Sequence, residues 1–154
     1  MQNELIKASL DPACIRLELK AKTRDEAIRE LVWLVHAKHS LRSPEQVLNV
    51  VMDRERMMTT SLENGIAVPH GKTDIVDKVL IAVGIKKSGI DFNSSDGQPS
   101  NIIILMVSPA ATSGPHMRCL AEISRLLTSE KTRMKLLEAK DVQTIYRIMT
   151  EPGV

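Results

Sequence analysis

Two unbroken apolar runs, Val79 to Ile85 and Ile102 to Val107, constrain the fold of this chain most strongly. β-Branched residues dominate both runs, which is typical of strands that are covered on both faces. Both runs are far shorter than the ~20 residues that a membrane-spanning helix needs. We therefore expect two central, buried strands, joined across a turn-forming stretch at residues 94–99, and no direct membrane insertion.

Helical patterns lie on both sides of these strands in the sequence. Thr23, with Glu26 three residues later, forms a capping box at the start of one helix. A second helix begins with Ser43 as its N-cap and Pro44 in its first turn, and is expected to end near Met57. After the strands, helical patterns occupy residues 116–127, 132–139 and 142–149.

Two weaker strand signals complete the pattern. Residues 13–19 alternate loosely and predict a short edge strand, and residues 65–68 predict another strand that is stopped by Pro69, His70 and Gly71. Helices on either side of a block of strands indicate a sheet enclosed by helices. We predict an α/β (α+β) fold: a single domain over residues 1–154, with a central mixed β-sheet flanked by helices on both faces.

Composition excludes several classes of function. Lys plus Arg is 21 and Asp plus Glu is 19, a balance too even for a nucleic-acid-binding surface. Aromatic residues make up only 2% of the chain, too few for a base-stacking platform. Cys14 and Cys119 lie far apart in the sequence, so we expect two buried thiols and neither a disulfide nor a structural zinc site. No signal segment is recognisable at the polar start of the chain, and a cytoplasmic location is expected.

Two histidines stand where function commonly resides. His70 follows a predicted buried strand, between Pro69 and Gly71, and a rigid sheet holds such strand-end side chains still. His116 stands at a helix start, where free N–H groups and the helix dipole suit an anion and favour a neutral imidazole. Taken alone, each residue also fits an ordinary loop or helix-start histidine.

Other polar clusters have simpler interpretations. His36 and His39 are three residues apart on a helix, but no carboxylate accompanies them, so they predict a solvated face rather than a metal site. The charged run 53–56 predicts a solvent-exposed end of a helix. The side chains of Met57 and Met58 are expected to pack in the core. Nucleotide-binding loops and the G-x-S-x-G motif of hydrolases are absent.

The combined spacing of several motifs is far more specific. Arg54 and Glu55 precede Thr59 and Thr60, and the run Gly-Ile-Ala-Val-Pro-His closes at His70. Further motifs occur at residues 82–85, 89–92, 96–99 and from His116 to Leu127. Together they resemble the enzyme IIA domains, fructose/mannitol type, of the bacterial phosphoenolpyruvate-dependent sugar phosphotransferase system.

This resemblance implies a role for each matched residue. His70 would accept a phosphoryl group from phospho-HPr and pass it to a IIB component. Arg54, a permanent cation with a planar fork, and His116 would complete the active site. We hypothesise that Thr60, with Thr59 beside it, supports the phosphoryl oxygens. The resemblance implies no cofactor and no metal.

Two functions remain open at this point. The chain is either a phosphocarrier in sugar uptake or a regulatory module of the nitrogen-type branch. In the latter, the phosphorylation state of His70 would control binding to a transporter, kinase or regulator. The whole-family resemblance favours the carrier. A metal-dependent hydrolase built on His70 and His116 is a third class, but no carboxylate motif supports it.

Overall fold

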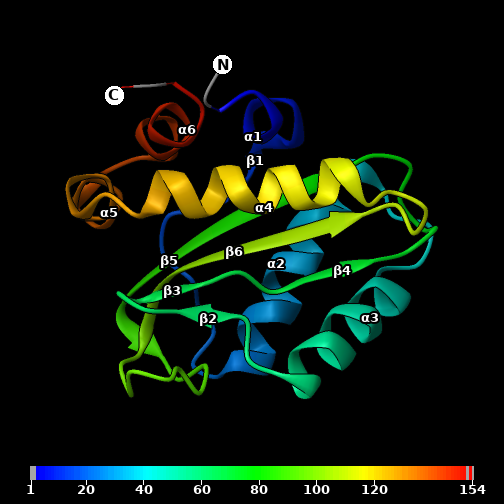
Figure 1. The fold of residues 1–154 in the computed structure, drawn as a ribbon, viewed down its shortest axis with the longest axis horizontal. Coiled ribbons are helices and arrows are strands. Elements are labelled where there is room, and N and C mark those ends of the chain that lie inside the picture. Colours follow the sequence, from blue (N-terminus) through cyan, green and yellow to red (C-terminus); the bar gives the residue numbers. More distant parts are fainter. Residues whose placement is uncertain (1–2, 152, 154) are drawn as a thin grey trace.

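The centre of the molecule is a six-stranded mixed sheet, seen in a computed structural model that describes residues 3–151 and 153 (Figure 1). The strand order is β1-β5-β6-β3-β2, and β4 pairs with β6 beyond the end of β3. Strand β1 pairs with β5, and β3 and β4 both pair with β6, in parallel orientation. The β5–β6 and β2–β3 pairs are antiparallel. The strands are β1 (Leu10–Arg16), β2 (Ser61–Leu62), β3 (Ile66–Ala67), β4 (His70–Lys72), β5 (Leu80–Ile90) and β6 (Ser100–Ser108).

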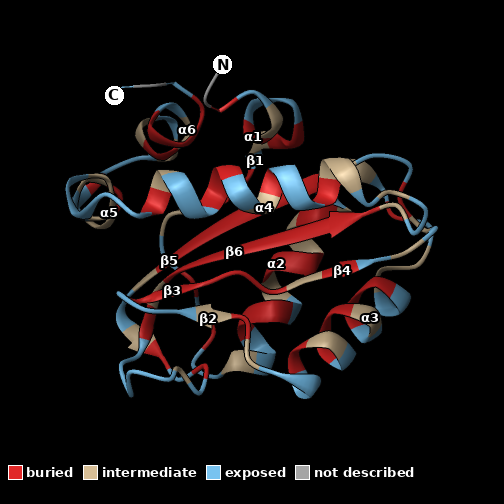
Figure 2. Cartoon of the chain, in the orientation of Figure 1, coloured by how far each residue is buried: buried red, intermediate tan, exposed pale blue. Residues whose placement is uncertain are grey.

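Helices cover both faces of this sheet, as the sequence predicted. Alternate residues of β5 enter two separate apolar cores: Leu80 and Ala82 face one core, and Ile81 and Val83 face the other. Helices α2 (Arg24–His39) and α3 (Pro44–Met57) close the first core. The second lies under α1 (Glu4–Ser9), α4 (Gly114–Leu127), α5 (Glu130–Glu138) and α6 (Val142–Thr150). Figure 2 shows the resulting buried sheet between helices that are exposed on their outer sides.

The helix starts predicted at Thr23 and Ser43 are confirmed by their caps. The Thr23 hydroxyl accepts a hydrogen bond from the backbone N–H of Glu26, and Ser43 accepts one from that of Gln46. Pro44 stands in the first turn of α3, and this helix ends at Met57. The placement of α3 matters for function because its C-terminal end lies beside β2 and β4 (Figure 1).

Two strand predictions need correction. The edge strand is residues 10–16 rather than 13–19, because pairing with β5 already begins at Leu10. The register of this pairing shifts between Leu10 and Ile15. Pro12 lies in this segment and has no N–H to donate to the neighbouring strand, so the sequence does not indicate that the strand has already begun. The strand predicted at residues 65–68 is confirmed as β3, whereas His70 does not lie in the loop expected after it. It begins the short strand β4, where it pairs with Met106 of β6.

The predicted positions of the cysteines and two of the histidines can also be compared. Cys14 and Cys119 are buried free thiols, as expected. His36 and His39 are half-buried rather than fully solvated. The His36 side chain is partly covered because its ring packs edge-on against Trp33. Met1 and Gln2, the polar start of the chain, lie outside the described residues. Within the described residues, no helix is long and apolar enough to cross a membrane.

Candidate active site

His70 is held at one edge of the sheet by its strand and by α3. The carbonyl of the preceding residue, Pro69, accepts a hydrogen bond from the Met106 backbone, and β4 then runs parallel to β6. Gly71 allows this strand to approach α3 closely, because a Cβ atom there would lie 2.8 Å from a methyl group of Val50. His70 is therefore anchored from both sides while its ring stays half-exposed.

The His70 ring has one nitrogen engaged inside the protein. Nδ1 lies 2.8 Å from the Val68 carbonyl oxygen. Since a carbonyl only accepts hydrogen bonds, we assign the ring proton to Nδ1, which leaves the lone pair on Nε2. Burial has the largest effect on the pKa of His70 and lowers it from the usual value, and the Arg54 charge lowers it further. The hydrogen bond to the Val68 carbonyl and the charge of Glu55 act in the opposite direction. His70 is thus a neutral imidazole at pH 7 with Nε2 as its nucleophilic atom.

His116 meets His70 from the opposite helix layer. It stands in the first turn of α4, where Pro115 precedes it, and is only 5% exposed. Its Nδ1 lies 2.7 Å from the hydroxyl oxygen of Ser108, the last residue of β6. Burial, together with the charges of His70 and Lys72, lowers the pKa of His116 to about 4. The predicted neutral state is confirmed, although burial rather than the helix start is the main cause.

Arg54 reaches the same place from the last turn of α3. Its Nη1 donates a hydrogen bond to the Met58 carbonyl oxygen at 2.8 Å, which orients the guanidinium along the loop after the helix. Among the described residues, no carboxylate forms an ion pair with it. A planar cation with several free donors therefore lies beside the neutral His70 ring.

The two threonines line the site, but their hydroxyl groups are engaged inside the protein. Thr59 donates to the Phe92 carbonyl oxygen, and Thr60 donates to the Glu55 carboxylate. Glu55 also accepts the Thr60 backbone N–H at 3.0 Å and is only 2% exposed. The expectation of a wet surface is therefore wrong for Glu55. Its spacing from Val51 on the buried face of α3 is the signal that could have identified it.

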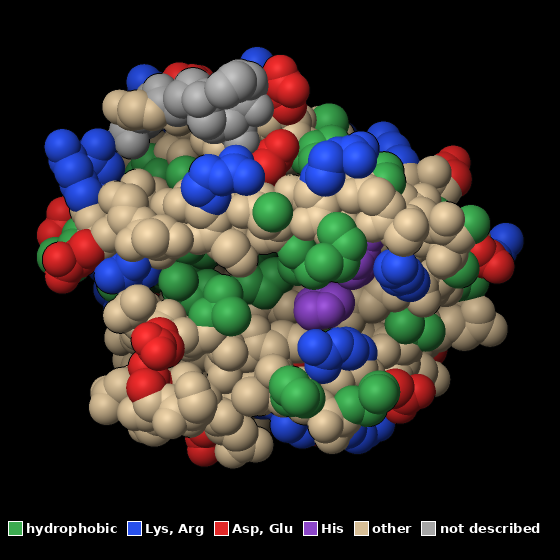
Figure 3. Space-filling model, viewed as in Figure 1, with side chains coloured by type: hydrophobic (Ala, Val, Ile, Leu, Met, Phe, Trp, Pro, Cys, Tyr) green, Lys and Arg blue, Asp and Glu red, His purple; other side chains and the backbone are tan. Residues whose placement is uncertain are grey.

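A pocket of about 220 Å³ brings these elements together. It connects the end of α3, the loop after it, His70 and the middle of α4. Its lining consists of Arg54, Thr59, Thr60, Ser61, Leu62, Val68, His70, Leu120 and Ser124. Figure 3 shows histidine atoms exposed on this face, with hydrophobic and basic side chains around them.

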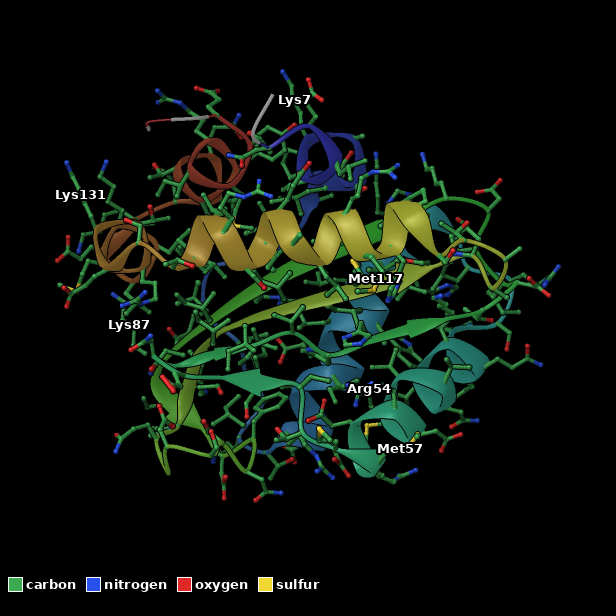
Figure 4. The ribbon with its side chains drawn as sticks, viewed as in Figure 1. Lys7, Arg54, Met57, Lys87, Met117 and Lys131 are labelled. Atoms are coloured by element: carbon green, nitrogen blue, oxygen red, sulfur yellow. The ribbon has the colours of Figure 1, made fainter. Side chains whose placement is uncertain are left out.

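Exposed apolar side chains lie on the segments that form this pocket, and one of them, Leu62, lines it. The methionine rim, as we call it, consists of Met57, Met58, Leu62 and Met117, which are 82%, 69%, 42% and 62% exposed. Figure 4 places Met117 at α4 and both Met57 and Arg54 at α3, on the other side of the sheet edge that carries His70. The prediction that Met57 and Met58 pack in the core is wrong, because α3 ends at Met57 and its last turn extends past the core.

Sequence comparison identifies relatives along almost the whole chain. The family model for the EIIA 2 component of the phosphoenolpyruvate-dependent sugar phosphotransferase system matches residues 8–151. The fructose-specific EIIA component of Haloferax volcanii is 34% identical over 137 residues, which are 89% of each protein. A nitrogen regulatory protein of Bradyrhizobium diazoefficiens is 32% identical over 141 residues, which are 92% of each. The chain covers only 22% of the fructose-specific EIIABC component of Bacillus subtilis, to which it is 31% identical.

Solved structures share the same fold. The nitrogen regulatory protein IIA-Ntr of Neisseria meningitidis superposes with a TM-score of 0.88 at 24% identity, over 95% of this chain and 99% of that one. The mannitol IIA of Escherichia coli gives a TM-score of 0.77 at 26% identity, over 92% and 99%. A complex of that enzyme with phosphorylated enzyme IIB gives 0.79 at 24% identity, over 92% and 96%.

Proposed function

Because this chain belongs to the EIIA 2 family of the phosphoenolpyruvate-dependent sugar phosphotransferase system, we propose that Nε2 of His70 accepts a phosphoryl group from phospho-HPr. His70 then passes the group to a IIB component. The family match confirms the predicted phosphotransferase class. The observation that supports His70 best is the hydrogen bond from its Nδ1 to Val68, which leaves Nε2 as a nucleophile in an open pocket.

The transfer needs no proton to leave the His70 ring. The bond between phosphorus and the donor's histidine nitrogen breaks while the Nε2–P bond forms, and the donor nitrogen keeps the electron pair. Because Nδ1 keeps its proton, the phosphorylated ring carries a positive charge next to the dianionic phosphoryl group. Neutral imidazole is the leaving group in the second transfer, so the Nδ1 proton keeps the phosphoryl group transferable.

Arg54 and His116 act on the charge of the group in transfer. Phosphoryl transfer is catalysed mainly by positioning and charge neutralisation. At an effective dielectric constant near 20, one opposite charge at 4 Å contributes about 4 kcal/mol before desolvation costs. Arg54 supplies that charge. The neutral His116 ring donates from Nε2–H on the opposite side, in the tautomer whose Nδ1 accepts the Ser108 hydroxyl proton. Thr59 and Thr60 support the site indirectly, since their hydroxyl protons already bind Phe92 and Glu55.

The methionine rim is the surface for the donor and the acceptor. Both partners must present their reacting atom to the same nitrogen of His70, so both dock around the same pocket. Exposed methionines suit this use because their side chains adapt to different surfaces. The solved complex of a mannitol IIA with phosphorylated IIB supports a IIB component as the acceptor. In this proposal, residues 1–154 act as one EIIA-type domain in the cytoplasm, without a cofactor.

A regulatory role is the second candidate. The nitrogen regulatory protein of B. diazoefficiens matches 92% of this chain, with identity similar to that of the fructose-specific EIIA component. In that role the same His70 chemistry would set the affinity for a regulated transporter, kinase or regulator. Transfer from phosphorylated protein to a IIB component separates the two roles.

Intact-mass spectrometry tests the phosphocarrier chemistry. The chain is incubated with phosphoenolpyruvate, enzyme I and HPr, beside the variants His70→Ala and His39→Ala. We expect one acid-labile phosphoryl group on the parent chain and on His39→Ala, which changes a histidine outside the site, and none on His70→Ala. Phosphorylation of His70→Ala, or none on the parent chain with a matched HPr, would reject the proposal.

A further inference from the structure

A buried carboxylate lies behind the active site and does not contact the reacting atoms. Glu55 is on the core-facing side of α3. Its two oxygens serve one residue: Oε2 accepts the Thr60 backbone N–H, and Oε1 accepts the Thr60 hydroxyl. A buried charge is tolerated only when it is well hydrogen-bonded, and within the described part of the chain the partners of this one all lie in the loop that forms the pocket wall. The residue therefore fixes Thr60 in position.

From Thr60 a series of hydrogen bonds continues to the His70 ring. The Thr60 carbonyl accepts the Val68 N–H at 3.1 Å, and the Val68 carbonyl accepts Nδ1–H of His70 at 2.8 Å. Every donor in the series points toward Glu55: His70 donates to Val68, Val68 to Thr60 and Thr60 to the carboxylate. Val68 is buried, so water does not compete for these bonds.

We propose that Glu55 is a positioning residue for phosphoryl transfer. Through Thr60 and Val68, it fixes the His70 ring in the Nδ1–H tautomer and in one orientation. This inference rests on the proposed function for its effect on rate, but its effect on the ring is independent of any partner.

The chemistry of His70 explains why an anion belongs at the end of this series. The ring gains positive charge when Nε2 takes the phosphoryl group, and the bond from Nδ1 to Val68 then becomes charge-assisted. Aligned hydrogen bonds in a buried environment strengthen one another. The negative charge of Glu55 also acts against the burial and the Arg54 cation that lower the pKa of His70. Glu55 thus favours the ring state that the transfer requires.

The test compares Glu55→Gln with Glu45→Gln, an identical change at an exposed site on the same helix. The ¹⁵N shifts of the His70 ring report the tautomer, and intact-mass time courses with phospho-HPr report the rate. In Glu55→Gln we expect a mixed tautomer and a phosphorylation rate lowered about 10- to 100-fold, since small misplacements of a reacting group cost that much. Glu45→Gln is expected to match the parent chain in both.

Thr60 variants keep the test decisive if Glu55→Gln does not fold. Thr60→Val removes the hydroxyl bond to Glu55 but keeps the backbone bond, and Thr60→Ser restores the hydroxyl. A mixed tautomer and slow transfer in Thr60→Val, rescued in Thr60→Ser, support the inference. A folded Glu55→Gln or Thr60→Val with the parental tautomer, or with the parental rate, overturns it. Failure of the proposed function is distinguishable, because the parent chain itself would then gain no phosphoryl group.

Discussion

The rings of His70 and His116 meet edge to face, with their centroids 5.5 Å apart and their planes at 63°. Each ring has Nδ1 bonded to an oxygen inside the protein, that of the Val68 carbonyl or the Ser108 hydroxyl. The pKa values of both are lowered, and a charge on His70 adds to the effect on His116. The pair therefore provides one neutral nucleophile and one neutral neighbour at physiological pH.

Replacement of Arg54 tests the charge that the account assigns to it. We expect Arg54→Ala to lower the rate of phosphoryl acceptance by about 100- to 1,000-fold, because one preorganised donor to the transferring group is lost. Arg54→Lys keeps the charge but not the planar fork and should give an intermediate rate. Arg56→Ala changes an exposed arginine of the same helix and serves as the control. A parental rate in Arg54→Ala would contradict this role.

Ser108 is predicted to set the state of His116. Ser108→Ala leaves the buried Nδ1 without a partner, so we expect the free energy of unfolding to fall by about 1–3 kcal/mol. The ring should also lose its single tautomer, and phosphoryl acceptance should slow about tenfold as its donor becomes disordered. Denaturant titration, ring ¹⁵N shifts and transfer rates measure the three effects. Ser88→Ala, an exposed serine of β5, is the control, and equal behaviour of the two variants would refute the prediction.

The free energy of unfolding is expected to decrease at acidic pH, because His116 is buried as a neutral ring. Its pKa is about 6.5 in the unfolded chain and about 4 in the folded protein. Between these values the unfolded state binds more protons, so the free energy of unfolding decreases as the pH falls from 6.5 to 4 and levels off below. The contribution of His116 is about 3 kcal/mol.

The variant His116→Gln isolates this contribution. Urea titrations of both proteins across pH 4–7 should show a smaller acid loss in the variant than in the parent chain. Identical pH dependence in the two proteins would mean that His116 titrates normally in the folded state.

The methionine rim is predicted to contribute to partner binding and not to folding. A Met57→Gln, Met58→Gln double variant should raise the KM for phospho-HPr about tenfold, since exposed apolar contacts at an interface are lost. Its free energy of unfolding should stay within about 0.5 kcal/mol of the parental value. Met134→Gln, an exposed methionine of α5 outside the rim, is the control for steady-state kinetics. An unchanged KM in the double variant would exclude the rim from docking.

Sequence patterns predicted the layers of the fold because periodicity reports burial directly. The apolar runs that form most of β5 and β6 place apolar side chains on both faces of the sheet, as is expected of strands between two layers of helices. Caps at Thr23 and Ser43 set helix starts through bonds between residues only three apart. Strand β4 escaped prediction because its three residues are held by β6, which lies far away in the sequence.

The site was only partly predictable for the same reason. Arg54, Thr59, Thr60 and His70 line one pocket, and the family resemblance had grouped them. The charged neighbours of Glu55 predict exposure, because charged side chains usually face water, although Glu55 faces the core. Ser108 closes an apolar run, and its bond to His116 depends on how α4 crosses the sheet. The apolar side chains of Met57 and Met58 predict core packing, because residue type alone does not reveal where a helix extends beyond the core.

The most direct test of the central claim is ³¹P–¹⁵N NMR of the chain after phosphorylation by phospho-HPr, with ¹⁵N in its histidine rings. The account predicts that phosphorus is coupled to Nε2 of His70 while Nδ1 of the same ring still carries its proton. Coupling to Nδ1 of His70, or to a nitrogen of any other histidine, would contradict it.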